Sequence, residues 1–309
     1  MVIFNRGILK DSSFFFQMLI LISTVIMGMI FGQYLFIGFA YLKSGFSVGD
    51  LNEFMSHVNG NAQLLRQSLF FQTVFAFFFP SLLIAYFFSD NTKEYLQTDQ
   101  GFPGSVMLLT ILSIIFVLPF LNATVYWSHQ IAFPDSLKAI ESKLIEWETQ
   151  AQQLNNMILI TDSYSDFLMN LLIVAVFAAV AEEFLFRGVL QNVFGKIFRN
   201  PHVVIWTVGI IFSIIHFQFY GFFARTFLGV YLGYLLYYTK SIWVPVLAHF
   251  TNNAIGVISY YSIKDPETFK KVDEVGTGST SWLSLLSLCL FVVTVVVLIK
   301  KCKSQRLLS

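Results

Sequence analysis

Long apolar stretches without charge constrain this chain more than any other feature. No charged residue occurs between Asp11 and Lys43, and a helix needs only about 20 apolar residues to cross the hydrocarbon core of a bilayer. A signal peptide has a shorter apolar core, of about 7–15 residues, so we expect this stretch to be a retained first span. The whole sequence is 56% hydrophobic and only 12% charged. These properties predict a multi-pass membrane protein.

Apolar runs of this kind recur along the chain, and they predict an all-α, polytopic membrane helical bundle of about eight transmembrane helices. The predicted spans are 13–41, 67–89, 105–127, 165–195, 202–218, 222–240, 242–262 and 281–299. The sixth is the weakest, because Arg225 lies at its start, and without it the spans number about seven. We interpret 42–66 and 263–280 as polar connections. No internal repeat is evident, so residues 1–309 are predicted to form a single integral membrane domain.

The basic residues of the short connections predict the orientation. In an eight-span arrangement they all fall on one side, which the positive-inside rule assigns to the cytoplasm. These residues are Arg6, Lys10, Lys196, Arg199, Lys240, Lys300, Lys301, Lys303 and Arg306. Both termini are therefore predicted to be cytoplasmic, and we expect the membrane to be the cytoplasmic (inner) membrane of a bacterium.

One predicted external insertion, 128–163, has its own pattern. Apolar residues recur there at steps of three and four: Leu137, Ile140, Leu144, Trp147, Ala151, Leu154 and Ile158. This stripe predicts an amphipathic helix, started by Pro134 and Asp135. We expect it to lie along the membrane surface or to pack on the bundle rather than to form a coiled coil.

Three charges interrupt the fourth predicted span. Glu183 and Arg187 are four residues apart, so they share a helical face and can form an ion pair. Glu182 lies about 100° further round the helix and is left over. Because burying an uncompensated charge in a membrane costs at least ~2.5 kcal/mol, Glu182 is expected to have a partner or a function.

Two later spans carry candidate partners for these charges. His216 ends the sequence FSIIH, and His249 and Asn253 lie four apart in HFTNN, on one face of a helix. Three helices can thus converge on a polar centre. One interpretation is a buried network that only fixes helix packing. The other is a functional site, since ionisable groups inside a membrane commonly mark one.

The same residues resemble the three motifs of the CAAX prenyl protease and bacteriocin-processing family of intramembrane glutamic endopeptidases. The motifs are Glu182-Glu183-x-x-x-Arg187, Phe212-x-x-x-His216 and His249-x-x-x-Asn253, in the family's order. Three linked motifs are more specific than any one of them. The resemblance covers roughly 165–260, which is the predicted catalytic core.

The resemblance implies a role for each residue in hydrolysis of a peptide bond. Glu182 and His216 would activate water, and His249 and Asn253 would donate hydrogen bonds to the oxyanion. Glu183 and Arg187 would support the helix geometry. No cofactor is expected, and the partners are a peptide or protein substrate at the membrane and the lipid bilayer.

Other functions remain open at this stage. Glu182, His216 and His249 could instead be ligands of zinc in a membrane peptidase, although no H-E-x-x-H occurs. A transporter, a non-enzymatic scaffold and an immunity protein could each contain the same polar residues. Ser213 and Cys289 are interpreted as passive, and Cys289 and Cys302 as free thiols. The net charge of +1 and the lack of a long basic run argue against a nucleic-acid partner.

Overall fold

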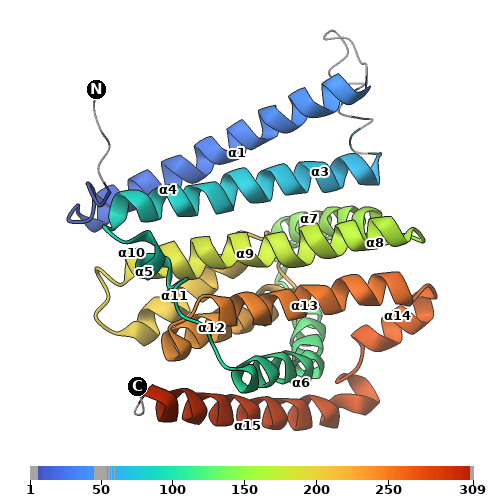
Figure 1. The fold of residues 1–309 in the computed structure, drawn as a ribbon. Coiled ribbons are helices and arrows are strands. Elements are labelled where there is room, and N and C mark those ends of the chain that lie inside the picture. Colours follow the sequence, from blue (N-terminus) through green and yellow to red (C-terminus); the bar gives the residue numbers. More distant parts are fainter. Residues whose placement is uncertain (1–5, 45–53, 55, 57, 59, 307–309) are drawn as a thin grey trace.

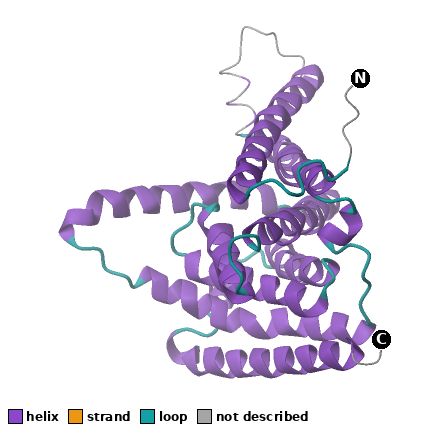
Figure 2. Cartoon of the chain, turned by 90° about the vertical axis from the view of Figure 1, so that its left-hand side faces the viewer, coloured by secondary structure: helices purple, strands orange, loops and turns teal. Residues whose placement is uncertain are grey.

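The structure, a computed structural model, describes residues 6–44, 54, 56, 58 and 60–306. All regular secondary structure in this part of the chain is helical (Figure 2). The longer α-helices are α1 (Phe14–Ser44), α3 (Ala62–Gln72), α4 (Phe79–Phe88), α6 (Gly104–His129), α7 (Lys138–Leu159), α11 (Pro201–Ile214), α12 (Phe222–Thr239), α13 (Trp243–Ser262) and α15 (Ser281–Arg306). The shorter ones are α5 (Thr92–Leu96), α8 (Tyr164–Asn170), α9 (Ala178–Glu183), α10 (Gln191–Phe194) and α14 (Pro266–Asp273).

Three π-helical segments join some of these helices into longer rods. They are η1 (Thr73–Phe78), η3 (Leu171–Phe177) and η4 (Phe184–Leu190), and two 3₁₀ turns, η2 (Asp135–Leu137) and η5 (Gly278–Thr280), precede α7 and α15. π-Helical segments are rare and frequently occur at functional sites. Two of the three flank α9, which carries the adjacent glutamates.

Five helical rods of the described chain are long and apolar enough to cross a membrane. They are Phe14–Lys43, Ala62–Phe88, Gly104–His129, Tyr164–Phe194 and Glu267–Ser304. The count of about eight is not confirmed. At 1.5 Å per residue, α11 is only ~21 Å long, shorter than the ~30 Å hydrocarbon core. The helices α12 and α13 do not meet these criteria either, and they contain polar residues such as Arg225, His249 and Asn253.

Several predicted boundaries were wrong. The predicted span 202–218 ends early, because the chain leaves the helix after Ile214 and Phe217 adopts a left-handed φ of 52°. The connection 42–66 lies partly outside the described residues, but its last part belongs to α3. The connection 263–280 contains α14, whose N-cap Asp265 accepts a hydrogen bond from the Thr268 amide.

The rods pack in the pairs that Figure 1 shows, with α1 along α3 and α4, and α6 along α15. The rod that runs from α8 to α10 lies between the first pair and α13. The α11–α12 pair is especially close, because a Cβ atom at Gly229 would lie 3.0 Å from the Cα of Gly209. Glycine permits this close backbone approach. Gly233, one turn further along α12, packs closely against α11 as well, because a Cβ atom there would lie 2.9 Å from the Ile205 side chain.

Both chain ends lie at the same end of the bundle (Figure 1). Basic side chains gather there: Lys10 pairs with Asp90 at 2.5 Å, and the Lys196 ammonium donates to the Lys10 carbonyl at 2.7 Å. Near the C-terminus, Lys303 lies over the ring of Tyr238. Three of the residues used to predict the orientation, Lys10, Lys196 and Lys303, thus lie at one end of the bundle.

The predicted external helix is present as α7. Much of its apolar stripe is exposed, including Ile140 at 53% and Leu154 at 45%. It contacts the rest of the molecule through the stripe residue Trp147 and through Glu148, which lies off the stripe. Glu148 accepts a hydrogen bond from the Tyr220 amide at 3.3 Å, and the Trp147 ring lies edge-on to Phe217.

Candidate active site

The predicted site residues converge from three parts of the bundle. They are Glu182 and Glu183 at the end of α9, Arg187 in η4, His216 in the turn after α11, and His249 and Asn253 on α13. We refer to Glu182, Glu183, Arg187 and His249 as the Glu–Arg–His cluster. Its members are joined by short polar contacts deep inside the molecule.

Glu183 is the centre of this cluster. Its Oε1 accepts a hydrogen bond from Arg187 Nη1 at 2.9 Å, as the four-residue spacing predicted, and contacts His249 Nδ1 at 2.7 Å. Both the Glu183 and the Arg187 side chains are 0% exposed. The contact with His249 was not predicted, because 66 residues separate the two in sequence. Glu183 therefore joins α9 to α13 as well as to η4.

Arg187 is held by two further contacts. Its Nη2 donates to the carbonyl of Gly229 at 2.9 Å, and its guanidinium lies 4.7 Å from the centre of the Phe212 ring. The ion pair therefore also connects to α11 and α12. Removing one partner of a buried ion pair costs about 3–5 kcal/mol, because the other charge is left uncompensated.

Glu182 contacts the same histidine from its other side. Its Oε2 lies 3.8 Å from His249 Nε2, so the imidazole lies between the two adjacent glutamates. The Glu182 side chain is 19% exposed, whereas that of Glu183 is fully buried. Among the described residues, no group donates a hydrogen bond to Glu182 Oε2. That oxygen can accept a proton or a hydrogen bond from a reacting molecule.

His216 is oriented by its own backbone. Its Nδ1 lies 2.7 Å from the Phe212 carbonyl, and a carbonyl can only accept, so Nδ1 carries the proton. The Nε2 of a neutral His216 is then an acceptor. The Phe212 ring lies 5.0 Å from the His216 ring and 5.9 Å from the His249 ring, so it packs between the two.

The amide of Asn253 is fixed by two neighbours. Its Nδ2 donates to the Val174 carbonyl in η3 at 2.9 Å, and its Oδ1 accepts from the Asn252 amide at 3.2 Å. An amide nitrogen has two hydrogens, so one remains available to a ligand.

A cavity of about 240 Å³ lies beside these groups. His216, His249, Asn252 and Asn253 line it, and Glu182 lies behind this lining, 3.8 Å from His249 Nε2. Arg225 also lines the cavity. It was not predicted as a site residue from the sequence, where it was considered only as a charge that weakens the prediction of the sixth span. Its Nη2 donates to the Gln218 carbonyl at 2.8 Å, whereas its buried Nε has no partner among the described residues. The signal that could have identified Arg225 is its position as a charge inside an apolar run.

The other candidate nucleophiles play no part in this arrangement. Ser213 Oγ donates to the Phe222 carbonyl at 2.8 Å and so ties the end of α11 to the start of α12. Cys289 is exposed and Cys302 is buried, and the two do not form a disulfide with each other, as predicted. Within the described residues, no group of three His, Cys, Asp or Glu side chains is placed to hold a metal ion.

The fold and the site thus define a helical membrane protein with a buried Glu–Arg–His cluster beside a polar cavity. Residues 164–255 match the family model of the Rce1-like type II CAAX prenyl endopeptidases, so the resemblance inferred from the three motifs is confirmed for this segment. The family match supports a membrane endopeptidase.

Part of the chain is also similar to one curated protein. The chain is 36% identical over 81 residues to the uncharacterized protein YpbD of Bacillus subtilis (strain 168), an alignment that covers 25% of this chain and 38% of that protein. The chain thus matches well under half of that relative's length. No solved structure matches the chain.

Proposed function

We propose that this protein is an intramembrane endopeptidase that hydrolyses a peptide bond with water activated by Glu182. The observation that carries the proposal is the contrast between the two adjacent glutamates. Glu183 is fully buried and its Oε1 contacts both Arg187 and His249, whereas the Glu182 side chain is 19% exposed and its Oε2 has no hydrogen bond from the described residues. A carboxylate in this setting is suited to take a proton from water.

In the proposed reaction, Glu182 carries the proton from water to the leaving amine. Glu182 accepts one proton from water while His216 Nε2 accepts a hydrogen bond from the same molecule. The oxygen then forms a bond to the substrate carbonyl carbon. The resulting oxyanion receives hydrogen bonds from the second amide hydrogen of Asn253 and from His249 Nε2–H. Collapse breaks the carbon–nitrogen bond, and Glu182 returns its proton to the leaving amine.

The role of His249 requires a particular protonation state. Because Nδ1 contacts the Glu183 carboxylate, a donor at Nε2 exists only when the ring carries both protons. Glu182 and Glu183 flank the two ring nitrogens, which provides that state with its counter-charges. We infer that Glu183 positions His249 and provides a counter-charge for its protonated ring, and that Arg187 acts by positioning Glu183.

A zinc peptidase is the alternative mechanism. The Nε2 atoms of both histidines and the carboxylate of Glu182 are chemically suitable zinc ligands. The 3.8 Å between Glu182 Oε2 and His249 Nε2 would have to shorten for both to bind one ion at ~2.0–2.2 Å in tetrahedral geometry. Dialysis against a chelator separates the mechanisms: cleavage that persists supports water activation by Glu182, and cleavage restored only by zinc supports the metallopeptidase.

We further propose the remaining features of the protein in its membrane. The helices α11, α12 and α13 form three shorter spans within the bundle, which gives about eight in all. The basic end faces the cytoplasm of a bacterium, and a peptide or protein is cut at the inner membrane. A transporter, a scaffold or an immunity protein is the alternative if purified protein with an intact fold cleaves no peptide.

A further inference from the structure

Three cavities follow one another along α13. The first is the site cavity, the second has a volume of about 560 Å³ and the third about 410 Å³. Asn252 lines both the first and the second, and Gln152 and Tyr260 line both the second and the third. The shared residues make the three cavities consecutive parts of one groove, which we call the α13 groove.

A single face of α13 forms the base of the groove. The lining residues recur at steps of three and four, as residues on one helical face do: His249, Asn252, Gly256, Ser259 and Ile263. At 1.5 Å per residue, the path from His249 to Ile263 is ~21 Å long. An extended polypeptide rises ~3.3 Å per residue, so about six residues fit along it.

The walls of the groove come from α6, α7 and α14. Ile115 and Pro119 contribute from α6, Gln152 and Asn156 from α7, and Phe269 from α14. All three helices lie outside residues 164–255, so the family match does not cover the walls of this groove.

The α7 wall is held at two points. The Ile158 carbonyl near its C-terminal end accepts a hydrogen bond from Arg66 Nη2 at 3.0 Å. In its middle, Glu148 accepts from the Tyr220 amide and the Gln218 side chain, in the turn that carries His216. Between these two anchors, Gln152 and Asn156 face the groove.

The lining chemistry suits a polypeptide backbone. Within the described chain, the side-chain amides of Gln152 and Asn156 make no hydrogen bond, and Asn252 uses only one of its amide hydrogens. Each amide can both donate and accept, as the N–H and C=O groups of an extended peptide require. Between them lie apolar groups such as Ile115, Pro119 and Phe269, which can cover substrate side chains. A lipid acyl chain has no partner for the amides.

We propose that the α13 groove binds an extended polypeptide segment of about six residues next to the bond that is cut, with α7 as its outer wall. The inference rests on the proposed function, because the occupant of the groove is the substrate of that site. It adds a substrate class: an unfolded stretch of chain that enters between α7 and α14, rather than a dipeptide or a folded surface.

Gly256 offers a direct test. A Cβ added there meets nothing within 4 Å and Gly256 lines the second cavity, so the side chain of Gly256→Leu would project into the groove. Gly38→Leu is the matched control, because a Cβ at exposed Gly38 on α1 also meets nothing within 4 Å. Both variants replace a helical glycine and are expected to keep the parental unfolding temperature or to raise it slightly.

The probe is a library of randomised decapeptides that carry a benzophenone group, crosslinked by light to the full-length protein in detergent. Labelled positions are mapped by mass spectrometry. We expect label on α7 and α14 in the parent, in Glu182→Gln and in Gly38→Leu, and loss of that label in Gly256→Leu. Two results would overturn the groove as a peptide site. One is unchanged labelling of α7 and α14 in Gly256→Leu. The other is a phospholipid that co-purifies with the parent in place of the peptide label and is lost only in Gly256→Leu.

Cleavage by the same proteins separates this proposal from the proposed function. For a decapeptide that is cut, Gly256→Leu should lower kcat/KM by about tenfold or more, as expected from a loss of ~1.4 kcal/mol or more of binding free energy. Gly38→Leu should cut the same decapeptide at the parental rate, and the loss in Gly256→Leu should be smaller for a tetrapeptide trimmed around the cut bond. If α7 and α14 are labelled but no peptide is cut, the proposed endopeptidase activity is contradicted. If Gly256→Leu changes the cleavage of neither peptide, peptide binding in the α13 groove is contradicted.

Discussion

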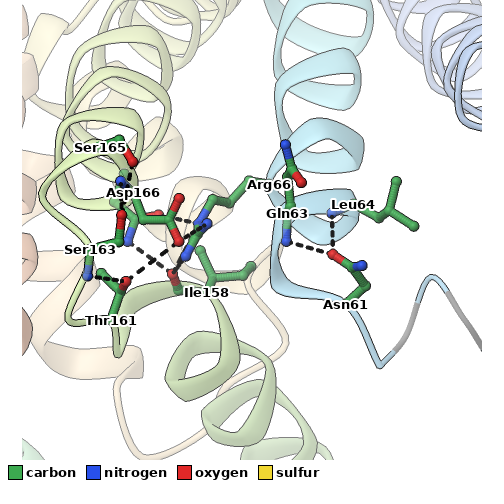
Figure 3. A network of polar contacts seen from close by, with 10 residues as sticks. Asn61, Gln63, Leu64, Arg66, Ile158, Thr161, Ser163, Ser165 and Asp166 are labelled. Atoms are coloured by element: carbon green, nitrogen blue, oxygen red, sulfur yellow. Dashed lines mark hydrogen bonds and ion pairs between the residues drawn. The ribbon is translucent and has the colours of Figure 1, made fainter. Parts of the chain in front are cut away.

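Two buried arginines organise this molecule, and their surroundings differ. Arg187 belongs to the Glu–Arg–His cluster, and Arg66 lies at the opposite end of the bundle from the chain termini, where α3, α7 and α8 meet (Figure 3). Arg66 is 3% exposed. Its Nη1 pairs with Asp166 at 2.9 Å and its Nε donates to Asn170 at 2.8 Å. We call these residues, with Ile158, the Arg66 cluster.

The difference lies in what each network leaves unpaired. Every guanidinium nitrogen of Arg66 has a partner. In the Glu–Arg–His cluster, Glu182 Oε2, Glu183 Oε2 and Arg187 Nε are buried without a hydrogen bond from the described residues. A saturated network fixes a structure, whereas an unsaturated one beside a cavity indicates a reactive site. The comparison predicts that the Arg66 cluster contributes only to stability, whereas the Glu–Arg–His cluster contributes to both stability and turnover.

The largest effect on stability is expected for Glu183→Gln. The change leaves Arg187 buried without its counter-charge, which should lower the free energy of unfolding by about 3–5 kcal/mol. Thermal unfolding in detergent measures this, with Glu94→Gln on an exposed position as the matched control. Equal unfolding temperatures for the two variants would contradict the claim that Glu183 stabilises the Glu–Arg–His cluster.

Asn253 should have the next largest effect, and on turnover rather than on folding. Loss of an oxyanion donor costs about 2.7–4 kcal/mol of transition-state stabilisation, or roughly 10²–10³ in kcat. Asn253→Asp keeps the shape of the side chain but removes both donors, so it should be slowed as much as Asn253→Ala. Parental kcat in Asn253→Asp would contradict the donor role.

Arg66→Gln should destabilise less and leave turnover intact. The variant frees the Ile158 carbonyl and Asn170, at a cost of about 1–3 kcal/mol, and Asp166 is 40% exposed, so water can solvate it. The kcat of a tetrapeptide, normalised to folded protein, is the relevant readout. A hundredfold fall in kcat would contradict the claim that the Arg66 cluster contributes to stability and not to turnover.

The smallest effect is expected at the exposed Lys10–Asp90 pair. The hydrogen bond from Lys10 to Asp90 raises the pKa of the Lys10 ammonium above its usual range. A raised folded-state pKa means that this contribution to stability is complete below the ordinary lysine pKa and is lost as pH rises through the raised value. The difference in unfolding temperature between the parent and Lys10→Gln should therefore be small, should shrink in high salt and should disappear at strongly alkaline pH. A difference that persists at alkaline pH would rule out this pair as its source.

The spacing of residues within one helix predicted only part of the site. The apolar runs predicted the long rods, and the four-residue spacing predicted the Glu183–Arg187 pair. Contacts between distant segments could not be predicted in this way: the bond between Glu183 and His249 depends on how α9 packs against α13. The Arg66 cluster was missed for the same reason, because its nearest partner is 92 residues away.

Backbone geometry set a second limit on prediction from the sequence. The π-helical segments η3 and η4 flank α9 within the fourth predicted span, where the residue spacing was interpreted as that of a regular α-helix. The end of α11 at Ile214 was missed, because apolar residues continue through the turn that carries His216. By contrast, α14 had a readable start signal in Asp265 followed by Pro266.

The central claim is that two adjacent glutamates have different functions. The most direct test is the cleavage rate per folded molecule of Glu182→Gln, measured beside Glu183→Gln on one cleavable peptide. Glu182→Gln should keep the parental unfolding temperature and lower kcat by roughly 10²-fold or more, because the base is lost while size is kept. Parental kcat in folded Glu182→Gln would contradict water activation by Glu182.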